Sequence, residues 1–268
     1  MKKSTYNLIT FSLIALAVAA VAVYYLPSVN FFGDETADLL FKDVLLRVFV
    51  AALGVFLVAT SKCKDLLTPK IKRLPVNLLI ILPCIAVALV NFPFSALISG
   101  KATVERYELI PLLFIECVAI GVFEETFFRA LLTDYVADKL KNTRYNVFWT
   151  VIISSAVFAA WHLFNLFAGA SVGGTMLQLL YTFLLGAMFS FVTISTGDIW
   201  LPIALHAVFD FGGALVSRLG TGEFQDAIFW ILTLSVGTLC GVYVFIGLIR
   251  LQKKETADRN VQTETDKT

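Results

Sequence analysis

The side chains best suited to chemistry in this sequence are ionisable groups that lie inside apolar segments. Glu124 and Glu125 lie in one such segment, His162 in a later one, and His206 and Asp210 in a third. An ionisable group at bilayer depth costs roughly 2.5–3.5 kcal/mol or more, so such residues mark functional sites. Carboxylates and imidazoles can share the activation of a water molecule or bind a metal ion. Both histidines of the chain belong to this set.

The spacing of the acidic residues divides their roles. Glu125 and Arg129 are four residues apart, so a helix places them on one face and favours an ion pair that supports the helix. Glu124 points about 100° away around the helix and has no such partner, which makes it the candidate reactive carboxylate. Glu116 lies two turns earlier, and we interpret it as structural.

The two histidines have neighbours at the same spacing. His206 and Asp210 share a helix face, which suits either an aspartate that orients the imidazole or a pair that faces one water or metal ion. Phe158 is placed to pack beside His162. Counted from the ends of their segments, Glu124, His206 and Asp210 lie at similar depths in the cytoplasmic half of the membrane. His162 lies deeper by this count, but helix tilt can absorb the difference, so we expect all four side chains to share one cavity.

The elements that position these residues are membrane helices. The chain has 268 residues, of which 58% are hydrophobic and 15% charged, and its mean hydropathy is +0.82. A soluble domain is less apolar and has more charge. We therefore predict an all-α, polytopic membrane helix bundle, because only helices with internally paired backbones or closed barrels cross lipid. Eight segments are long enough to span: Tyr6–Leu26, Leu45–Thr60, Pro75–Phe94, Leu109–Leu132, Val147–Ala168, Thr175–Thr196, Ile199–Ser217 and Ile228–Arg250.

The distribution of basic residues predicts the topology. With the amino terminus in the cytoplasm, fifteen Lys and Arg lie on the cytoplasmic side and five on the other, so both termini are predicted to be cytoplasmic. An alternative for Met1–Leu26 is a cleaved secretory signal. We predict an N-terminal three-span region (1–108), a helical core with the ionisable motifs (109–217), a last transmembrane helix (218–250) and a disordered cytoplasmic tail (251–268).

Other site classes find no support in the sequence. The net charge is +1, and the few charges lie between apolar runs, which argues against nucleic-acid binding. The four cysteines are scattered, without the spacing of a disulfide scaffold or a cysteine zinc site.

Three short motifs together resemble the CAAX protease and bacteriocin-processing family of intramembrane proteases, which includes type II CAAX prenyl endopeptidases and abortive-infection proteins. They are Glu124-Glu125-x-x-x-Arg129, Phe158-x-x-x-His162 and His206-x-x-x-Asp210, and Trp200–Ile203 resembles the family's approach to the third motif. The resemblance covers about Leu109–Ser217. The first three predicted spans and the last are not characteristic of the family.

The resemblance implies an endopeptidase that hydrolyses a peptide bond of a membrane-associated or lipidated protein or peptide precursor near the cytoplasmic face. Glu124 and His162 would activate the attacking water, with Glu125, Arg129 and Phe158 in support. His206 and Asp210 would stabilise the oxyanion or help to bind a metal. Many family members have asparagine at the position of Asp210. An ionised aspartate cannot donate to an oxyanion and would instead orient His206 or bind a metal. An aspartate protonated by its apolar setting could still donate.

Several alternatives stay open. A metal-free site uses Glu124 as general base, whereas a metalloprotease would hold one zinc or other divalent ion through His162, His206 and a carboxylate. The HExxH zinc signature is absent. A prenylated CAAX tail and a peptide leader are equally compatible as substrates. A catalytically silent immunity or scaffold protein and a proton-coupled transporter are the alternative functions.

Overall fold

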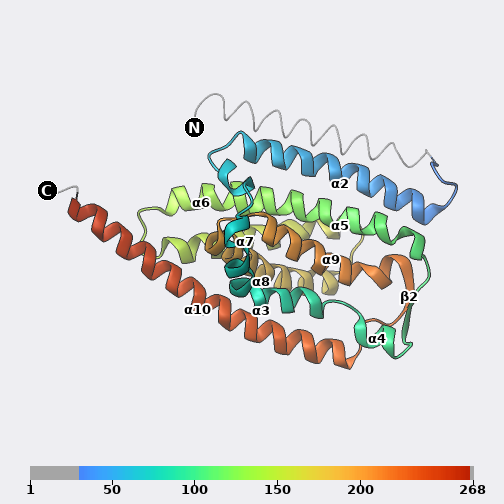
Figure 1. Ribbon diagram of the computed structural model, residues 1–268. Helices are drawn as coiled ribbons and strands as arrows, with labels where there is room; N and C mark the ends of the chain where they lie inside the picture. The colour runs from blue at the N-terminus through green and yellow to red at the C-terminus, as the bar shows by residue number, and fades with distance from the viewer. Residues whose placement is uncertain (1–29, 266–268) are drawn as a thin grey trace.

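The computed structural model describes residues 30–265, and these form a bundle of long helices (Figure 1). The predicted span Tyr6–Leu26 and the alternative signal segment lie outside the described residues. The long helices are α2 (Glu35–Ala59), α3 (Leu74–Val90), α5 (Ile110–Glu124), α7 (Asn146–Trp161), α8 (Val172–Thr196), α9 (Trp200–Leu219) and α10 (Ala227–Thr265). Shorter elements are η2 (Lys64–Leu67), η3 (Ile71–Arg73), α4 (Phe94–Ile98), η4 (Tyr107–Leu109), η5 (Glu125–Leu132), α6 (Thr133–Leu140) and η6 (His162–Leu166).

The predicted all-α membrane architecture is confirmed. Within residues 30–265, five helical stretches are long and apolar enough to cross a membrane, namely Ile71–Val90, Asn146–Leu166, Val172–Thr196, Trp200–Leu219 and Ala227–Val261. The predicted spans Leu45–Thr60 and Leu109–Leu132 lie in α2 and in α5 with η5, which run along the same bundle (Figure 1). The total of eight spans stays a prediction.

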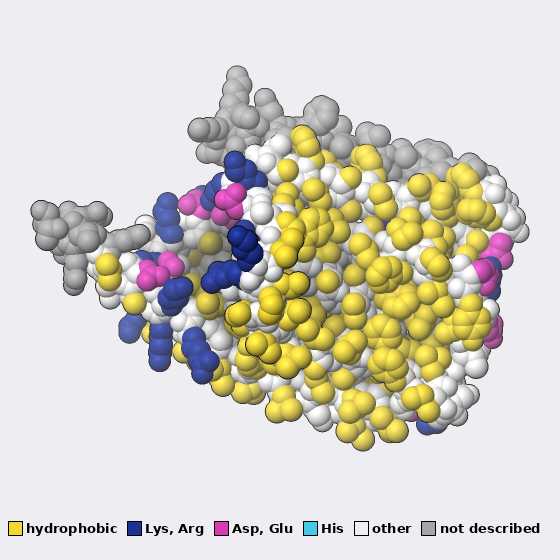
Figure 2. All heavy atoms as spheres, in the orientation of Figure 1, with side chains coloured by type: hydrophobic (Ala, Val, Ile, Leu, Met, Phe, Trp, Pro, Cys, Tyr) yellow, Lys and Arg dark blue, Asp and Glu magenta, His cyan; other side chains and the backbone are white. Residues whose placement is uncertain are grey.

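The outer surface of the bundle suits lipid rather than water. Side chains such as Leu79 (72% exposed) and Leu239 (71% exposed) point outward, and a broad apolar surface covers the middle of the molecule (Figure 2). Lys and Arg gather at the end where α10 finishes (Figure 2). A continuous apolar surface of this extent is typical of a membrane protein. The chain is a multi-pass integral membrane protein.

Helices α5 and α9 form the centre of the bundle. Helix α5 packs against α2 on one side and against α9 on the other, while α7 pairs with α8. Pro202 lies in the first turn of α9, where the missing N–H has no helical partner in any case. The Asp198 carboxylate accepts hydrogen bonds from the backbone N–H groups of Trp200 and Lys70, which ties the start of α9 to the segment between η2 and η3.

The structure corrects two boundaries of the sequence prediction. The segment Val147–Ala168 is not one α-helix, because α7 ends at Trp161 and His162 begins the 3-10 helix η6. The Asn165 amide donates to Gln178 of α8 at 2.8 Å, which holds this tighter segment against the next helix.

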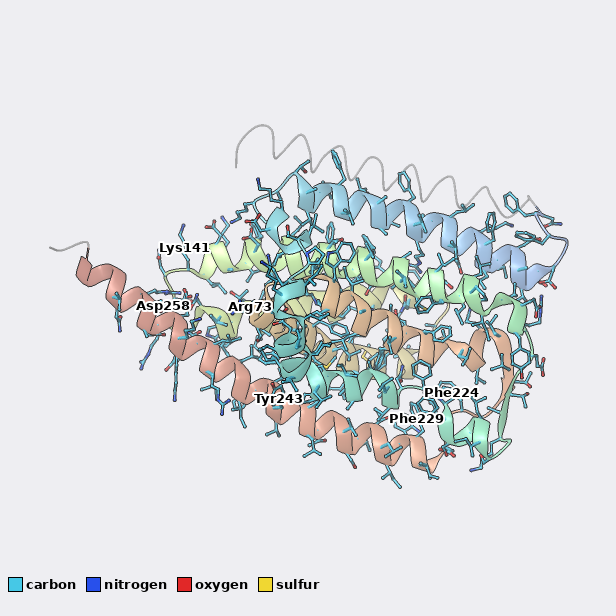
Figure 3. The ribbon with its side chains drawn as sticks, viewed as in Figure 1. Arg73, Lys141, Phe224, Phe229, Tyr243 and Asp258 are labelled. Atoms are coloured by element: carbon cyan, nitrogen blue, oxygen red, sulfur yellow. The ribbon has the colours of Figure 1, made fainter. Side chains whose placement is uncertain are left out.

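The predicted disordered tail from Leu251 is helical through Thr265, as a continuation of α10. The Gln252 side chain explains how this extension is anchored. Its carbonyl oxygen accepts from the Val147 N–H at 2.9 Å, and its amide nitrogen lies 3.2 Å from the Arg144 carbonyl oxygen. Gln252 thus satisfies an unpaired donor at the start of α7. Lys141, before α7, and Asp258, on α10, lie at the same end of the molecule (Figure 3).

A small antiparallel strand pair was not expected from the sequence. Strand β1 (Ala102–Val104) pairs with β2 (Gly220–Gly222), with Thr103 opposite Thr221. A β-carbon at Gly222 would meet the Lys101 carbonyl oxygen, so the close approach of the two strands requires glycine there. The pair links the segment before α5 to the end of α9.

Replacing Gln252 by alanine should loosen the contact between α10 and α7. Because a buried side chain with several hydrogen bonds is lost, we expect a destabilisation of about 1–3 kcal/mol, measured as a lower melting temperature in detergent. Lys254→Ala, at an exposed position of the same helix, is the matched control. Equal melting temperatures of the two variants would contradict this account of the extension.

Candidate active site

The helix that carries Glu124 and Glu125 changes its geometry between these two residues. The α-helix α5 ends at Glu124, and η5, from Glu125 to Leu132, is π-helical. Threonine hydroxyls satisfy carbonyls on either side of the change, since Thr126 donates to the Val122 oxygen at 2.7 Å and Thr133 to the Phe128 oxygen at 2.8 Å. π-helical turns are rare in proteins, and those that occur are often found at functional sites. This segment therefore marks the candidate site independently of its acidic residues.

The predicted ion pair between Glu125 and Arg129 is present in the interior. Arg129 Nε lies 3.1 Å from Glu125 Oε2, and both side chains are almost fully buried. The guanidinium also lies over the Phe158 ring, 3.9 Å from its centroid, and 5.3 Å from that of Phe189. A desolvated cation is stabilised by aromatic faces of this kind. Arg129 is therefore held by one carboxylate and two rings.

Glu125 has a second partner that the sequence did not reveal. Its other oxygen, Oε1, lies 2.7 Å from Nδ1 of His206 on α9. One carboxylate therefore joins Arg129 of its own helix to the imidazole of another helix. A short bond of this kind fixes the orientation of the ring and leaves its second nitrogen, Nε2, for other contacts.

Two further carboxylates face that second nitrogen. His206 Nε2 lies 3.5 Å from Glu124 Oε2 and 3.4 Å from Asp210 Oδ2. Of the four residues predicted to share a cavity, Glu124, His206 and Asp210 thus lie together, whereas His162 adjoins them through the Phe158 ring. Glu124 and His206 are buried, while the Asp210 side chain is 28% exposed and forms the open side of the group.

Aromatic rings complete the environment of the imidazoles. Phe189 of α8 stacks on His206 with ring centroids 5.0 Å apart and an angle of 22° between the planes. Phe158 contacts the His162 ring edge-on at 5.1 Å, as its spacing predicted, and lies 6.2 Å from the His206 ring. Phe158 therefore lies next to both histidines. His162 is half-buried, and its Nδ1 lies 3.0 Å from the Phe158 carbonyl oxygen.

The close approach of α5 and α9 depends on Gly121. A β-carbon at this position would lie 3.0 Å from the Ile203 carbonyl oxygen and 3.5 Å from the β-carbon of His206. A larger side chain would push the two helices apart one turn before the acidic pair. Gly121 therefore allows the Glu125 carboxylate to reach His206.

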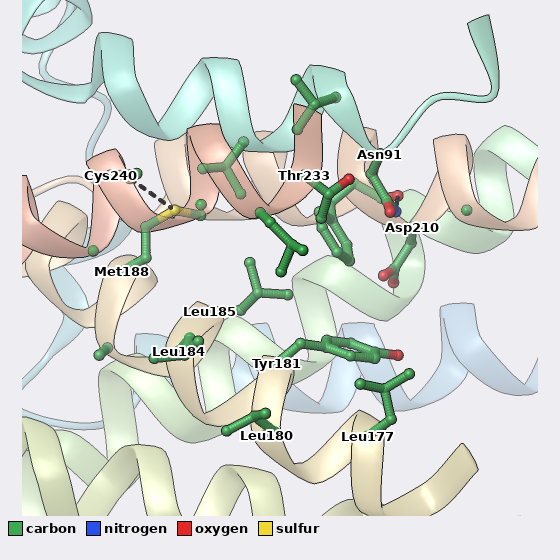
Figure 4. Close-up of a pocket in the computed structure, with 18 of the residues that line it drawn as sticks. Asn91, Leu177, Leu180, Tyr181, Leu184, Leu185, Met188, Asp210, Thr233 and Cys240 are labelled. Carbon is green, nitrogen blue, oxygen red and sulfur yellow. Dashed lines mark hydrogen bonds between the residues drawn. The ribbon is translucent and has the colours of Figure 1, made fainter. Parts of the chain in front are cut away.

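A large cavity reaches the candidate site from the side of α8 and α10. Its volume is about 990 Å³, and Asp210 belongs to its lining. Figure 4 shows Asp210 beside Asn91, while Met188 and Cys240 lie farther along the same cavity. The Asn91 amide donates to the Phe209 carbonyl oxygen at 2.7 Å. A bound molecule in this cavity would meet the site at Asp210.

The predicted metal ligands are not assembled into a metal-binding group. Within residues 30–265, no three His, Cys, Asp or Glu side chains are grouped so that they could hold a metal ion. The Nδ1 atoms of His162 and His206 contact the Phe158 carbonyl and the Glu125 carboxylate, respectively. Both contacts leave Nε2 of each ring as the atom that could bind an ion, so the zinc site considered from the sequence stays an alternative.

Sequence reasoning missed three features of the site. The π-helical segment has no sequence signal that we can name. The stacking of Phe189 on His206 depends on how α8 lies against α9. The contact of Glu125 with His206 was not predicted, because the i, i+4 spacing already assigned Arg129 as the partner of Glu125. Gly121, a small residue on the same helix as the acidic pair, was the sequence signal for a close approach of that helix to another.

Together the buried acids, the oriented imidazole and the apolar exterior define a membrane protein with a group of ionisable side chains enclosed in its helix bundle. Residues 106–212 match the family model described as type II CAAX prenyl endopeptidase Rce1-like, which confirms the resemblance that the three motifs predicted. The matched segment contains all of these motifs. The match to this family implies a protease that works within the membrane. Comparisons with curated proteins and with solved structures gave no match.

Replacing Gly121 by leucine should separate α5 from α9 and remove the contact between Glu125 and His206. Overpacking at a buried helix contact costs about 1–3 kcal/mol, so we expect a lower melting temperature in detergent. Gly173→Leu is the control, because a β-carbon there meets no atom within 4 Å. A Gly121→Leu protein as stable as this control would contradict the role given to Gly121.

Proposed function

We propose that this protein is a membrane-embedded endopeptidase that uses Glu124 to activate water. The observation that carries the proposal is the convergence of Glu124, Glu125 and Asp210 on the single imidazole of His206, inside the segment that matches the protease family. Peptide hydrolysis needs a base for the water and a donor for the developing oxyanion. The arrangement offers candidates for both.

The first step is the attack of water on the scissile carbonyl. Glu124 Oε2 accepts a proton from the water, and His162 holds the same water from the other side. The water oxygen forms a bond to the carbonyl carbon, and the carbonyl oxygen becomes an oxyanion. His206, protonated on both nitrogens, donates from Nε2 to this oxyanion, while its Nδ1–H donates to Glu125.

The second step breaks the peptide bond. The tetrahedral intermediate expels the amine, and the proton on Glu124 passes to the leaving nitrogen. Glu125 and Arg129 take no part in proton transfer, because they hold His206 in place. Asp210, at the open side of the group, keeps His206 Nε2 directed toward the substrate.

The substrate that we propose is a lipidated protein tail presented from the membrane. The matched family is described as a type II CAAX prenyl endopeptidase, and the apolar surface of the bundle favours a position of the site within the bilayer. The gathering of Lys and Arg at one end of the molecule favours a cytoplasmic position for that end. Both termini and the cleavage step are accordingly assigned to the cytoplasmic side.

Glu124→Gln should abolish cleavage. The probe is an internally quenched peptide with a farnesylated cysteine and a free carboxyl terminus, added to the purified protein in lipid. Because glutamine cannot accept the proton of the water, we expect a loss of about 10²–10⁴-fold in kcat. Glu108→Gln, at an exposed position before α5, should leave the rate unchanged.

Two results would decide against the proposal. If the wild-type protein leaves this probe intact together with unprenylated precursor peptides, a scaffold role replaces the protease. If Glu124→Gln cleaves at the wild-type rate, another residue is the base.

Removal of metal ions should leave the activity unchanged. The assigned steps need only side chains, so exhaustive treatment with o-phenanthroline should not lower the cleavage rate. Elemental analysis of the active protein should find no stoichiometric zinc. Loss of activity on chelation, with recovery on adding back zinc, would establish the metalloprotease alternative.

A further inference from the structure

The large cavity next to the candidate active site is lined by polar side chains at the end away from that site. It lies between α8 and α10, over α5 and α9, and most of its lining is apolar. Asp210 lines it near the candidate site, and Glu116 and Arg218 line it farther away. Gly237 and Gly241 of α10 also line the cavity, and a β-carbon at either one would meet no atom within 4 Å. The cavity therefore has room for a bound chain alongside α10.

Glu116 is buried and has one oxygen without a partner. The residue is 3% exposed. Its Oε1 lies 3.6 Å from Nη1 of Arg218, whose Nη2 is paired with Asp43 at 2.9 Å. Its Oε2 has no hydrogen-bond partner among the described residues. Oε1 is thus held by ion pairs that connect α5, α9 and α2, while Oε2 lacks a donor.

The chemistry of this oxygen indicates which kind of molecule would fill the cavity. A buried acceptor without a donor costs about 1–3 kcal/mol, and more when it is charged. A peptide that enters the hydrocarbon region has donors without acceptors, because its backbone N–H groups find no hydrogen-bond partners in lipid. A lipid acyl chain carries no donor. An extended peptide is therefore the occupant that satisfies Glu116.

The distance between the two polar ends fits a short peptide segment. Glu116 precedes Glu124 by eight residues on α5, which corresponds to about 12 Å along the helix. On α9, Asp210 and Arg218 are separated by the same interval. An extended chain advances about 3.3 Å per residue, so three to four residues bridge this distance.

We infer that Glu116 is a substrate-positioning residue, whose Oε2 accepts a hydrogen bond from a backbone N–H three to four residues from the scissile bond. This inference rests on the proposed endopeptidase function and adds to it the binding site for one arm of the peptide. Arg218, itself paired with Asp43, holds the other oxygen of this carboxylate, and Glu116 belongs to the lining of the cavity. Recognition of a backbone group gives this site preference for an extended segment rather than for a particular side chain.

The test combines variants of Glu116 with peptides that each lack one N–H. The farnesylated, internally quenched peptide is prepared with a single N-methylated amide at each position within four residues of the scissile bond. In the wild-type protein, we expect methylation at one position, three or four residues away, to lower kcat/KM by about 10- to 100-fold, as for a hydrogen bond to a charged group.

The penalty at that position should depend on residue 116. It should become smaller in Glu116→Gln, which keeps a neutral acceptor, and vanish in Glu116→Leu, which keeps none. Methylation at the other positions should affect all three proteins equally, and melting temperatures in detergent verify that each variant is folded.

The outcomes separate this inference from the proposed function. If the wild-type protein cleaves the unmethylated peptide but no position shows a penalty that depends on residue 116, the inference is wrong and the protease assignment stands. If competition by excess lipid removes the position-specific penalty, the cavity binds lipid instead. If the wild-type protein cleaves none of the peptides, the proposed function fails and the inference fails with it.

Discussion

The arrangement of the site depends on one carboxylate that is shared between two helices. Glu125 contacts Arg129 through one oxygen and His206 through the other, at 3.1 and 2.7 Å. Removing either partner from such a buried group leaves an uncompensated charge, which is costly in a low-dielectric interior. The shared carboxylate therefore fixes the His206 ring relative to α5. This in turn places Glu124, the next residue along the chain, opposite the other ring nitrogen.

The membrane setting explains why this polar group is enclosed so completely. Lipid supplies no hydrogen-bond partners, so ionisable side chains must find them inside the bundle. Phe158 and Phe189 cover Arg129 and His206 with their rings, which shields the charges from lipid. The close approach at Gly121 brings α5 and α9 near enough for these contacts. The packing of α5 against α9 therefore determines the geometry of the site.

The sequence was sufficient for the fold class and for the pairs that lie on one helix. Apolar segments predicted the bundle, and the i, i+4 spacing predicted the contacts of Glu125 with Arg129 and of His206 with Asp210. Contacts between helices could not be derived, because they depend on rotation and tilt that periodicity leaves open. The helical extension beyond Leu251 was missed because its polar composition resembles that of a disordered tail, whereas Gln252 anchors it to α7.

The most direct test of the shared carboxylate is nitrogen NMR of the histidine rings in lipid. The chain has two histidines, so His162→Gln leaves His206 as the single labelled ring. The account predicts a protonated Nδ1 whose resonance shows a short hydrogen bond and moves when Glu125→Gln is added, while Glu108→Gln leaves it in place. An Nδ1 resonance that is the same with and without the Glu125 carboxylate would contradict the account.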